Sequence, residues 1–309
     1  MNENTKPVIF AVENYAYLAE RLNADGRFEN GDILRKKFPD GEFYYKINSN
    51  LQNREVLLTG GMSTDKDTME IFDLACALVA LGIKKLHLFV PYFGYSTMER
   101  AVKQGEVVMA KNRARLLSAI PQAYMGNLVY FLDLHVAGLQ FYLEGEMHSE
   151  HLYGKSLVIE AAKEMGGDNF VLASTDAGRA KWVESLANDM GTDAAFVYKR
   201  RSSGSETAVT GVNADVKGRN VVIYDDMIRT GGSLIQAAQS YKNAGAKDIF
   251  AIATHGIFPG NAVEKIQNSG VIKQICVSDS HPNAVALQSD FLRVKSCAPI
   301  FLQSFGKSF

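Results

Sequence analysis

Two neighbouring carboxylates and a glycine-rich turn lie close together in the segment 220–234, which reads NVVIYDDMIRTGGSL. The apolar run 221–224 predicts a short strand that is buried on both faces. Asp225 and Asp226 follow where that strand is expected to end, and carboxylates, which only accept hydrogen bonds, suit the two hydroxyl groups of a ribose. Thr230-Gly231-Gly232-Ser233 then opens a helical stretch, where unpaired N–H groups and the helix dipole favour a phosphate. The segment therefore predicts a sugar-phosphate site.

The structural alternative for this segment is a surface turn with an aspartate cap. Glycine-rich turns are common in loops between strands and helices. The combination of two adjacent acids with Thr-Gly-Gly-Ser at one strand-to-helix junction is much rarer. For that reason we prefer the functional interpretation.

Two further polar side chains follow strand-like runs, at positions where open α/β sheets bind ligands. His135 ends the run Leu132-Asp133-Leu134-His135, and Asp176 lies within Ser174-Thr175-Asp176-Ala177-Gly178. A single histidine more often packs than binds a ligand. Together, however, His135 and Asp176 could hold a Mg²⁺-bound polyphosphate, with the aspartate acting through a metal-bound water.

A cationic run, Lys199-Arg200-Arg201, follows the predicted strand 195–198 and precedes the small polar segment 202–207. It could be a solvated hairpin tip. At the mouth of a phosphate site it is better explained as a mobile lid that carries positive charge.

Two other motifs have a structural explanation beside a functional one. The PDG within Phe38-Pro39-Asp40-Gly41-Glu42 is typical of a β-turn. The aromatic residues of Pro91-Tyr92-Phe93-Gly94-Tyr95 belong either to the core or to a wall for a flat base.

The elements that must position these residues are strand-like and helical runs in alternation. Such alternation favours parallel sheets covered by helices, an α/β fold. The expected strands are 8–12, 56–58, 86–90, 129–132, 170–173, 195–198, 221–224, 249–253 and 275–277, and amphipathic helices are expected at 68–80, 111–119, 156–164 and 179–187.

The chain also repeats itself, because the segment 54–94 can be aligned with 219–258 as strand, turn, helix and strand. In the first copy Gly60-Gly61 replaces the acidic pair, and Asp65-Lys66-Asp67 replaces Thr-Gly-Gly. We therefore expect two domains, 1–150 and 151–309, of which only the second keeps the ribose-phosphate site.

Composition excludes several classes of partner. A net charge of -1 over 309 residues argues against nucleic acid or an anionic membrane as the main partner, and no apolar run approaches the length of a membrane span. The three cysteines, Cys76, Cys276 and Cys297, are scattered, which indicates free thiols in a reducing compartment. The N-terminus is polar and has no signal-peptide pattern, so we expect a cytoplasmic protein.

Taken in order, FPDGE, PYFGY, LDLH, TDAG, YKRR, DDMIRTGGS and ATHGIF resemble motifs of the ribose-phosphate pyrophosphokinase (phosphoribosyl pyrophosphate synthetase) family. The resemblance covers nearly the whole chain. It implies two tandem type I phosphoribosyltransferase-like domains, the first of them with a degenerate site. The active site would lie between the domains.

The resemblance also implies roles for individual residues. Phe38, Asp40 and Glu42 would reach ATP from a neighbouring subunit of a homo-oligomer, either a dimer or a hexamer. The other implied roles are catalysis by Lys199 and Arg201, binding of Mg²⁺ by His135 and Asp176 and of nucleotide by His135, and binding of the ribose phosphate by residues 225–233.

The chain departs from the family at three places. After PYFGY the family has Ala-Arg-Gln-Asp, whose Arg and Gln help hold the adenine; here Thr97, Met98 and Glu99 follow Ser96, so we assign these three to a rebuilt nucleotide pocket. Arg229 stands where the family's DDMIDTGGT carries a third aspartate. The chain ends at Phe309 without the tail that helps form the family's allosteric site, which puts regulation by ADP or phosphate, and the family's hexamer, in question.

The predicted reaction transfers a diphosphate group from Mg-ATP to the anomeric hydroxyl of a ribose 5-phosphoryl acceptor and releases AMP. Ribose 5-phosphate is the expected acceptor, since the motif asks only for a ribose and a 5-phosphate. An additional cation, Arg229, would favour a more negatively charged acceptor such as ADP-ribose, and the product would then be ADP-ribose pyrophosphate.

Two more remote functions come from other classes. A phosphoribosyltransferase would consume the diphosphate product, but it needs no ATP site and usually has one such domain. A catalytically inactive regulatory relative usually loses the catalytic lysine or the acidic pair, and this chain keeps both.

Overall fold

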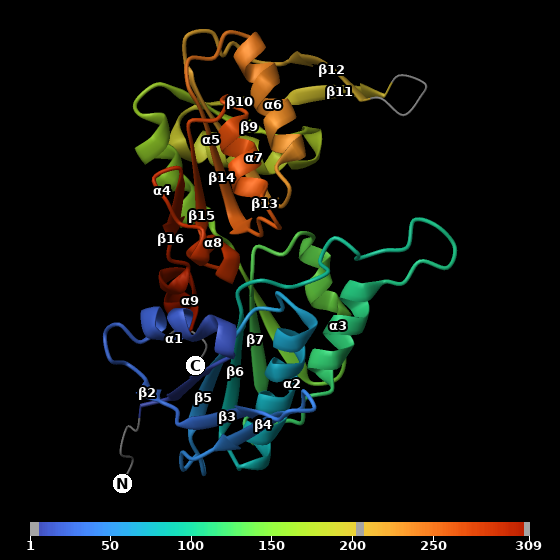
Figure 1. Cartoon of the computed structure of the whole chain (residues 1–309), viewed down its shortest axis with the longest axis vertical. Helices are drawn as coiled ribbons and strands as arrows, with labels where there is room; N and C mark the ends of the chain where they lie inside the picture. Colours follow the sequence, from blue (N-terminus) through green and yellow to red (C-terminus); the bar gives the residue numbers. More distant parts are fainter. Residues whose placement is uncertain (1–5, 202–206, 306–309) are drawn as a thin grey trace. The chain divides into compact units, whose positions relative to one another are not determined.

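The computed structural model of the chain describes residues 6–201 and 207–305. These residues form two compact units (Figure 1). One unit contains the chain up to Tyr153 together with helix α9 (Ala298–Phe305), and the other runs from Gly154 to Cys297. None of the described helices has the length and apolarity that a membrane-spanning helix requires.

The first unit is built on a six-stranded parallel sheet with the order β2-β1-β5-β6-β7-β8. Its central strands are apolar along almost their whole length because helices cover both faces. The antiparallel hairpin of β3 and β4 stands outside this sheet. The strands are β1 (Val8–Ala11), β2 (Glu29–Asn30), β3 (Ile33–Lys37), β4 (Phe43–Ile47), β5 (Glu55–Thr59), β6 (Lys85–Val90), β7 (Asn127–Leu132) and β8 (Met147–Leu152), and the helices are η1 (Glu13–Tyr15), α1 (Ala16–Leu22), α2 (Asp65–Ala80), α3 (Met109–Ser118) and η2 (Ala137–Tyr142).

Helix α9 packs with the first unit, whereas the sequence analysis placed residues 151–309 in one domain. The Phe301 ring stacks on Phe89 at 4.6 Å between centroids. The Phe305 ring lies against Phe28 at 5.3 Å and against His87 at 4.8 Å. The apolar pattern of α9 indicates that one face is buried, but it does not identify the core that buries it.

The second unit is built in the same way, with the parallel order β10-β9-β13-β14-β15-β16. Its antiparallel hairpin, formed by β11 and β12, precedes β13 in the chain, just as the β3–β4 hairpin precedes β5 in the first unit. The strands are β9 (Phe170–Ser174), β10 (Asp193–Ala195), β11 (Val197–Arg201), β12 (Thr207–Val212), β13 (Asn220–Ile228), β14 (Ile249–Gly256), β15 (Gln274–Ser278) and β16 (Leu292–Lys295), and the helices are α4 (Lys155–Gly166), η3 (Ala177–Arg179), α5 (Ala180–Met190), α6 (Gly232–Asn243), α7 (Ala262–Asn268) and α8 (Pro282–Ala286).

The matching strand orders show that β5 and α2 of the first unit correspond to β13 and α6 of the second. The predicted fold class, parallel sheets flanked by helices in two related units, is therefore confirmed. Strand β13 is also buried on both faces as predicted, because Val221 and Ile223 belong to one core cluster while Val222 and Tyr224 belong to the other.

Strand β13 extends further than the sequence predicted. It pairs with β9 only as far as Tyr224, opposite Ser174, but its pairing with β14 continues to Ile228. Asp225 and Asp226 are therefore part of the strand, not residues that follow it. Beyond Tyr224 they lie past the end of β9, where the chain after that strand can reach them.

Candidate active site

The first turn of α6 has no side-chain cap. The helix begins at Gly232, and its N-cap, Gly231, has a left-handed φ of 75° and makes no side-chain capping hydrogen bond. A Cβ atom at Gly231 would lie 2.4 Å from the Ile266 side chain, so both conformation and space require glycine here. Thr230 and Ser233 are exposed beside this turn. Backbone N–H groups at such a helix start are suited to a phosphate.

The corresponding turn of the first unit is closed. Helix α2 has Thr64 as its N-cap, whose Oγ1 accepts the Asp67 N–H at 3.1 Å, and Asp65 and Asp67 place negative charge in the first turn. These two acidic side chains already interact with the positive end of the helix dipole, and their negative charge would repel a bound anion. The first unit therefore lacks the uncapped helix start that the second unit has at α6.

The strand end before α2 also has no room for an acidic pair. A Cβ atom at Gly60 would lie 2.4 Å from the Val12 side chain, and one at Gly61 would lie 2.1 Å from the Tyr15 hydroxyl oxygen. The segment after β1 thus packs directly onto this strand end. Glycine replaces the two aspartates because the first unit fills this space with its own chain.

In the second unit the acidic pair has its own partners. The Thr175 hydroxyl donates to Asp225 Oδ2 at 2.9 Å, and the Asp226 N–H donates to Asp225 Oδ1 at 2.9 Å. Arg179 Nη2 lies 2.5 Å from Asp226 Oδ2, in an ion pair whose aspartate side chain is 5% exposed. These contacts hold both carboxylates in fixed positions in the part of β13 that extends past the end of β9.

Burial and the adjacent Asp226 raise the pKa of Asp225 to about 7, while Thr175 and Arg179 oppose this shift. Desolvation and a like charge both disfavour a second negative charge in this pair. Near neutral pH the pair therefore carries a proton for part of the time. An acid held in this way is typical of a functional site.

This pKa makes a prediction about stability. Between about pH 4 and 7 the folded state keeps a proton on Asp225 that the unfolded state releases, so stability falls as the pH rises through this range. Asp225→Asn should remove the effect. One pKa unit corresponds to about 1.4 kcal/mol. At pH 8 we therefore expect the free energy of unfolding of Asp225→Asn to exceed that of the wild type by at least about 1 kcal/mol, which corresponds to a rise in melting temperature of roughly 2–4 °C.

Thermal melts at pH 4.5 and pH 8 would test this prediction, with Asp290→Asn, a change at an exposed acid of the same unit, as control. The two Asn variants should match the wild type at pH 4.5. A Asp225→Asn variant that is no more stable than the wild type at pH 8 would contradict the assigned pKa.

Arg179 and Thr175 were not identified as site residues from the sequence. Both belong to the segment that follows β9, and they contact the acidic pair only because β13 projects past the end of β9. The sequence signal that could have identified Arg179 as a site residue was its position as a cation directly after the TDAG motif. The contact itself joins positions too far apart in the chain for local pattern analysis.

The two expected metal ligands lie at strand ends in different units. Asp176 follows β9, is exposed, and accepts the Gly178 N–H on Oδ1 at 2.8 Å. His135 follows β7 and is partly buried. Over residues 6–201 and 207–305, no three His, Cys, Asp or Glu side chains cluster so as to bind a metal ion by themselves. A Mg²⁺ ion would need phosphate oxygens and waters to complete its shell, which is the usual pattern for this ion.

Phe38, Asp40 and Glu42 occupy the tip of the β3–β4 hairpin, and all three are exposed. The Gly41 N–H donates to the Phe38 carbonyl at 3.0 Å, and the Glu42 N–H donates to Asp40 Oδ1 at 3.0 Å. The predicted turn is confirmed, and it leaves the three side chains open to a ligand.

The segment after β6 places Met98 on the surface, 46% exposed, beside Thr97 and Glu99. Of the aromatic residues that precede it, Tyr92 and Phe93 are buried, and Phe93 packs edge-on against Phe131 at 5.3 Å. These two aromatic side chains therefore belong to the core and do not form a wall for a base.

The backbone places Lys199 and Arg201 in β11, opposite Val209 and Thr207 of β12. The expected lid, 202–207, lies outside the described residues except for Thr207, and the side chains of Lys199 and Arg201 are likewise not described. Arg229 directly follows β13 and is exposed next to the Thr230-Gly231-Gly232-Ser233 turn.

Comparison with known proteins gives a consistent result along the chain. The model of the N-terminal domain of ribose phosphate pyrophosphokinase matches residues 7–120, and the model of the phosphoribosyl synthetase-associated domain matches residues 192–299. The chain is 33% identical over 276 residues to a ribose-phosphate pyrophosphokinase of Vibrio parahaemolyticus, covering 88% of this chain and 86% of the relative. It is 31% identical over 280 residues to the enzyme of that name from Pyrococcus abyssi, covering 90% and 94%.

A solved structure has the same fold. The phosphoribosylpyrophosphate synthetase from Mycobacterium smegmatis superposes with a TM-score of 0.85, at 24% identity, over 97% of this chain and 98% of that one.

Proposed function

The chain belongs to the ribose-phosphate pyrophosphokinase family, and on that premise we propose that it transfers a diphosphate group from Mg-ATP to the anomeric hydroxyl of ribose 5-phosphate. The products are phosphoribosyl pyrophosphate and AMP. One observation carries the proposal: the uncapped first turn of α6 follows shortly after the acidic pair of β13, of which Asp226 is buried. This is the arrangement that a sugar phosphate requires, with acceptors for its hydroxyl groups and donors for its phosphate.

In the proposed reaction the protein mainly positions the acceptor. Asp225 and Asp226 accept hydrogen bonds from the ribose hydroxyls, and residues 230–233 hold the 5-phosphate. Arg179 keeps Asp226 in place through the ion pair of 2.5 Å. The acceptor O1 then attacks the β-phosphorus of ATP in line, the β–α phosphate bond breaks, and AMP leaves.

Negative charge on the transferred group is neutralised by cations. We assign Lys199 and Arg201 to this role, and residues 202–207 to a lid that excludes water and so suppresses hydrolysis of ATP. His135 and Asp176 are the residues that would hold Mg²⁺. Asp176 suits a hydrated cation because it is exposed and, among the described residues, Oδ1 alone of its two carboxylate oxygens accepts a hydrogen bond. Bound Mg²⁺ would supply further charge neutralisation.

We assign ATP recognition to two segments of the first unit. The exposed tip residues Phe38, Asp40 and Glu42 would contact the nucleotide from a neighbouring subunit of a homo-oligomer. Residues 97–99, together with His135, would contact it from the same chain. Free cysteines at positions 76, 276 and 297 support a reducing compartment, and we place the protein in the cytoplasm.

ADP-ribose is the second candidate acceptor, and one observation favours it: Arg229 is exposed beside the phosphate loop. Ribose 5-phosphate nevertheless remains the first candidate. An exposed arginine is solvated by water and does not require a negatively charged ligand, as a buried arginine would. We expect kcat/KM with Mg-ATP to be higher for ribose 5-phosphate than for ADP-ribose by at least two orders of magnitude, about 2.7 kcal/mol of transition-state preference.

The measurement is AMP formation with each acceptor over a range of concentrations. Equal values, or a preference for ADP-ribose, would reassign the acceptor. Failure to form AMP with either sugar would favour a phosphoribosyltransferase or an inactive regulatory relative.

A further inference from the structure

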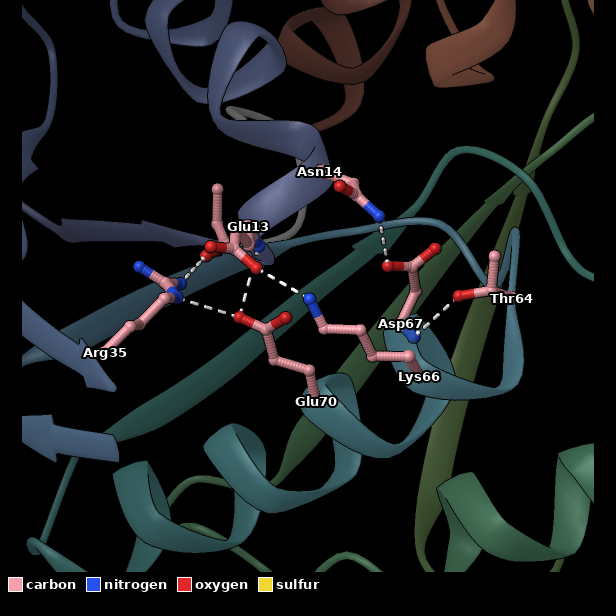
Figure 2. Close-up of polar contacts among 8 residues, drawn as sticks. Glu13, Asn14, Arg35, Thr64, Lys66, Asp67 and Glu70 are labelled. Carbon is pink, nitrogen blue, oxygen red and sulfur yellow. Dashed lines mark hydrogen bonds and ion pairs between the residues drawn. The ribbon is translucent and has the colours of Figure 1, made fainter. Parts of the chain in front are cut away.

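The first unit has polar contacts at the place where the second unit has its phosphate loop (Figure 2). Helix α2 starts there, next to the segment that follows β1. Asn14 Nδ2 donates to Asp67 Oδ1 at 2.7 Å, and Lys66 Nζ lies 2.7 Å from Glu13 Oε2. Lys66 and Asp67, which stand in the place of the phosphate loop, are thus engaged with the segment that follows β1.

Glu70 is at the centre of this group. Its side chain is 1% exposed, and its Oε1 accepts hydrogen bonds from the Glu13 N–H at 3.1 Å and from Arg35 Nε at 2.9 Å. A buried carboxylate is tolerated only when it is paired and hydrogen-bonded in this way. Loss of the arginine would leave an uncompensated charge in the interior.

Arg35 connects this centre to the β3–β4 hairpin. It belongs to β3, and besides Glu70 it reaches the Ala11 carbonyl at the end of β1, with Nη2 at 2.5 Å. One guanidinium therefore joins the hairpin, the main sheet and α2. On the other strand of the hairpin, the Phe43 ring lies under Lys66 Nζ, 4.8 Å from the ring centroid.

The hairpin needs such contacts because only one of its faces is half-buried and no residue of either strand is fully buried. It is not part of the six-stranded sheet, and Leu34, Phe38, Phe43 and Tyr44 are all between 39% and 45% exposed. A two-stranded hairpin without a packed face is only marginally stable in water. Its direction is thus set largely by polar contacts at its base.

We propose that Arg35 and Glu70 are positioning residues that fix the β3–β4 hairpin, and with it Phe38, Asp40 and Glu42, for binding ATP. The first unit's degenerate counterpart of the phosphate loop would then have a function of its own, as the anchor for the nucleotide-binding turn. This inference rests on the proposed function, since it assigns nucleotide contact to the hairpin tip. Neither Arg35 nor Glu70 is assigned a contact with substrate.

The test compares Arg35→Gln with Arg35→Lys and with Lys36→Gln, which removes an exposed cation from the same strand. Arg35→Gln should raise KM for ATP about tenfold, equivalent to about 1.4 kcal/mol, and leave KM for ribose 5-phosphate unchanged. Arg35→Lys should recover part of this loss, because an ammonium group can pair with Glu70 but cannot reproduce the planar fork. Lys36→Gln should match the wild type.

Calorimetric binding of α,β-methylene ATP gives a readout that does not depend on turnover, and it should weaken by the same factor in Arg35→Gln. Glu70→Gln provides a second test if Arg35→Gln does not fold, since the neutral isostere keeps an acceptor and weakens the ion pair. Its KM for ATP should rise as well. Unchanged ATP binding in the folded variants, or an equal rise in KM for both substrates, would show that Arg35 and Glu70 do not position the hairpin for ATP binding. An inactive wild-type protein would instead refute the proposed function.

Discussion

Replacing Lys199 or Arg201 with alanine is expected to lower kcat by at least about a hundredfold, the scale for the loss of one group that stabilises a transition state. Both residues lie in β11, next to the predicted lid. In the proposed reaction they act on the phosphoryl group that is being transferred, where negative charge develops. Binding of ribose 5-phosphate should change far less, because the acidic pair and the phosphate loop hold the acceptor.

Arg200→Ala is the matched control, because it removes the neighbouring cation of the same strand, to which we assign no role. Steady-state kinetics of the three variants and calorimetry with ribose 5-phosphate would measure both effects. If Lys199→Ala and Arg201→Ala kept near-normal turnover, the cations of this strand would not be catalytic. An equal loss in Arg200→Ala would indicate a general effect of charge.

A combined change of Asp225→Ala and Asp226→Ala is expected to abolish acceptor binding in calorimetry, whereas the wild type should bind one ribose 5-phosphate per chain. Thr175 and Arg179 hold the two carboxylates in β13, and the double variant removes both of the acceptors that we assign to the ribose hydroxyls. The first unit should not compensate. Its helix start is capped by Thr64, and the space above its strand end is filled by Val12 and Tyr15.

Asp290→Ala removes an exposed acid of the same unit and should bind like the wild type. Stoichiometric binding that persists in the double variant would show a second sugar-phosphate site in the first unit. A circular dichroism spectrum that matches the wild type would establish that loss of binding is not loss of folding.

Local sequence patterns predicted the parts of the site that depend on local geometry. Apolar residues and a Thr-Gly-Gly-Ser turn are sufficient to predict a strand and an uncapped helix start, and the structure contains both. The two acids, which were predicted to follow the strand, lie within it. The repeat predicted two related units because both copies keep the same order of strand, helix and strand. The length of β13 was underestimated, since pairing with β14 extends the strand through two charged residues.

Contacts between distant segments were not predictable in this way. Arg179 pairs with Asp226, and Arg35 pairs with Glu70, only because the sheets bring their segments together. The same holds for α9, whose Phe301 packs on Phe89 of the first unit. Periodicity identifies the buried face of an element, but the identity of its partner depends on topology and packing. The roles of His135 and Asp176 as ligands of one metal ion stay a prediction.

The most direct test of the account follows both products of one reaction by ³¹P NMR, with ATP, Mg²⁺ and ribose 5-phosphate. Transfer of an intact diphosphate predicts equal amounts of AMP and of a sugar that carries a diphosphate at C1 and a phosphate at C5. It predicts no ADP. Formation of ADP with a singly phosphorylated C1, release of free diphosphate without a sugar product, or no turnover at all would contradict the proposed reaction.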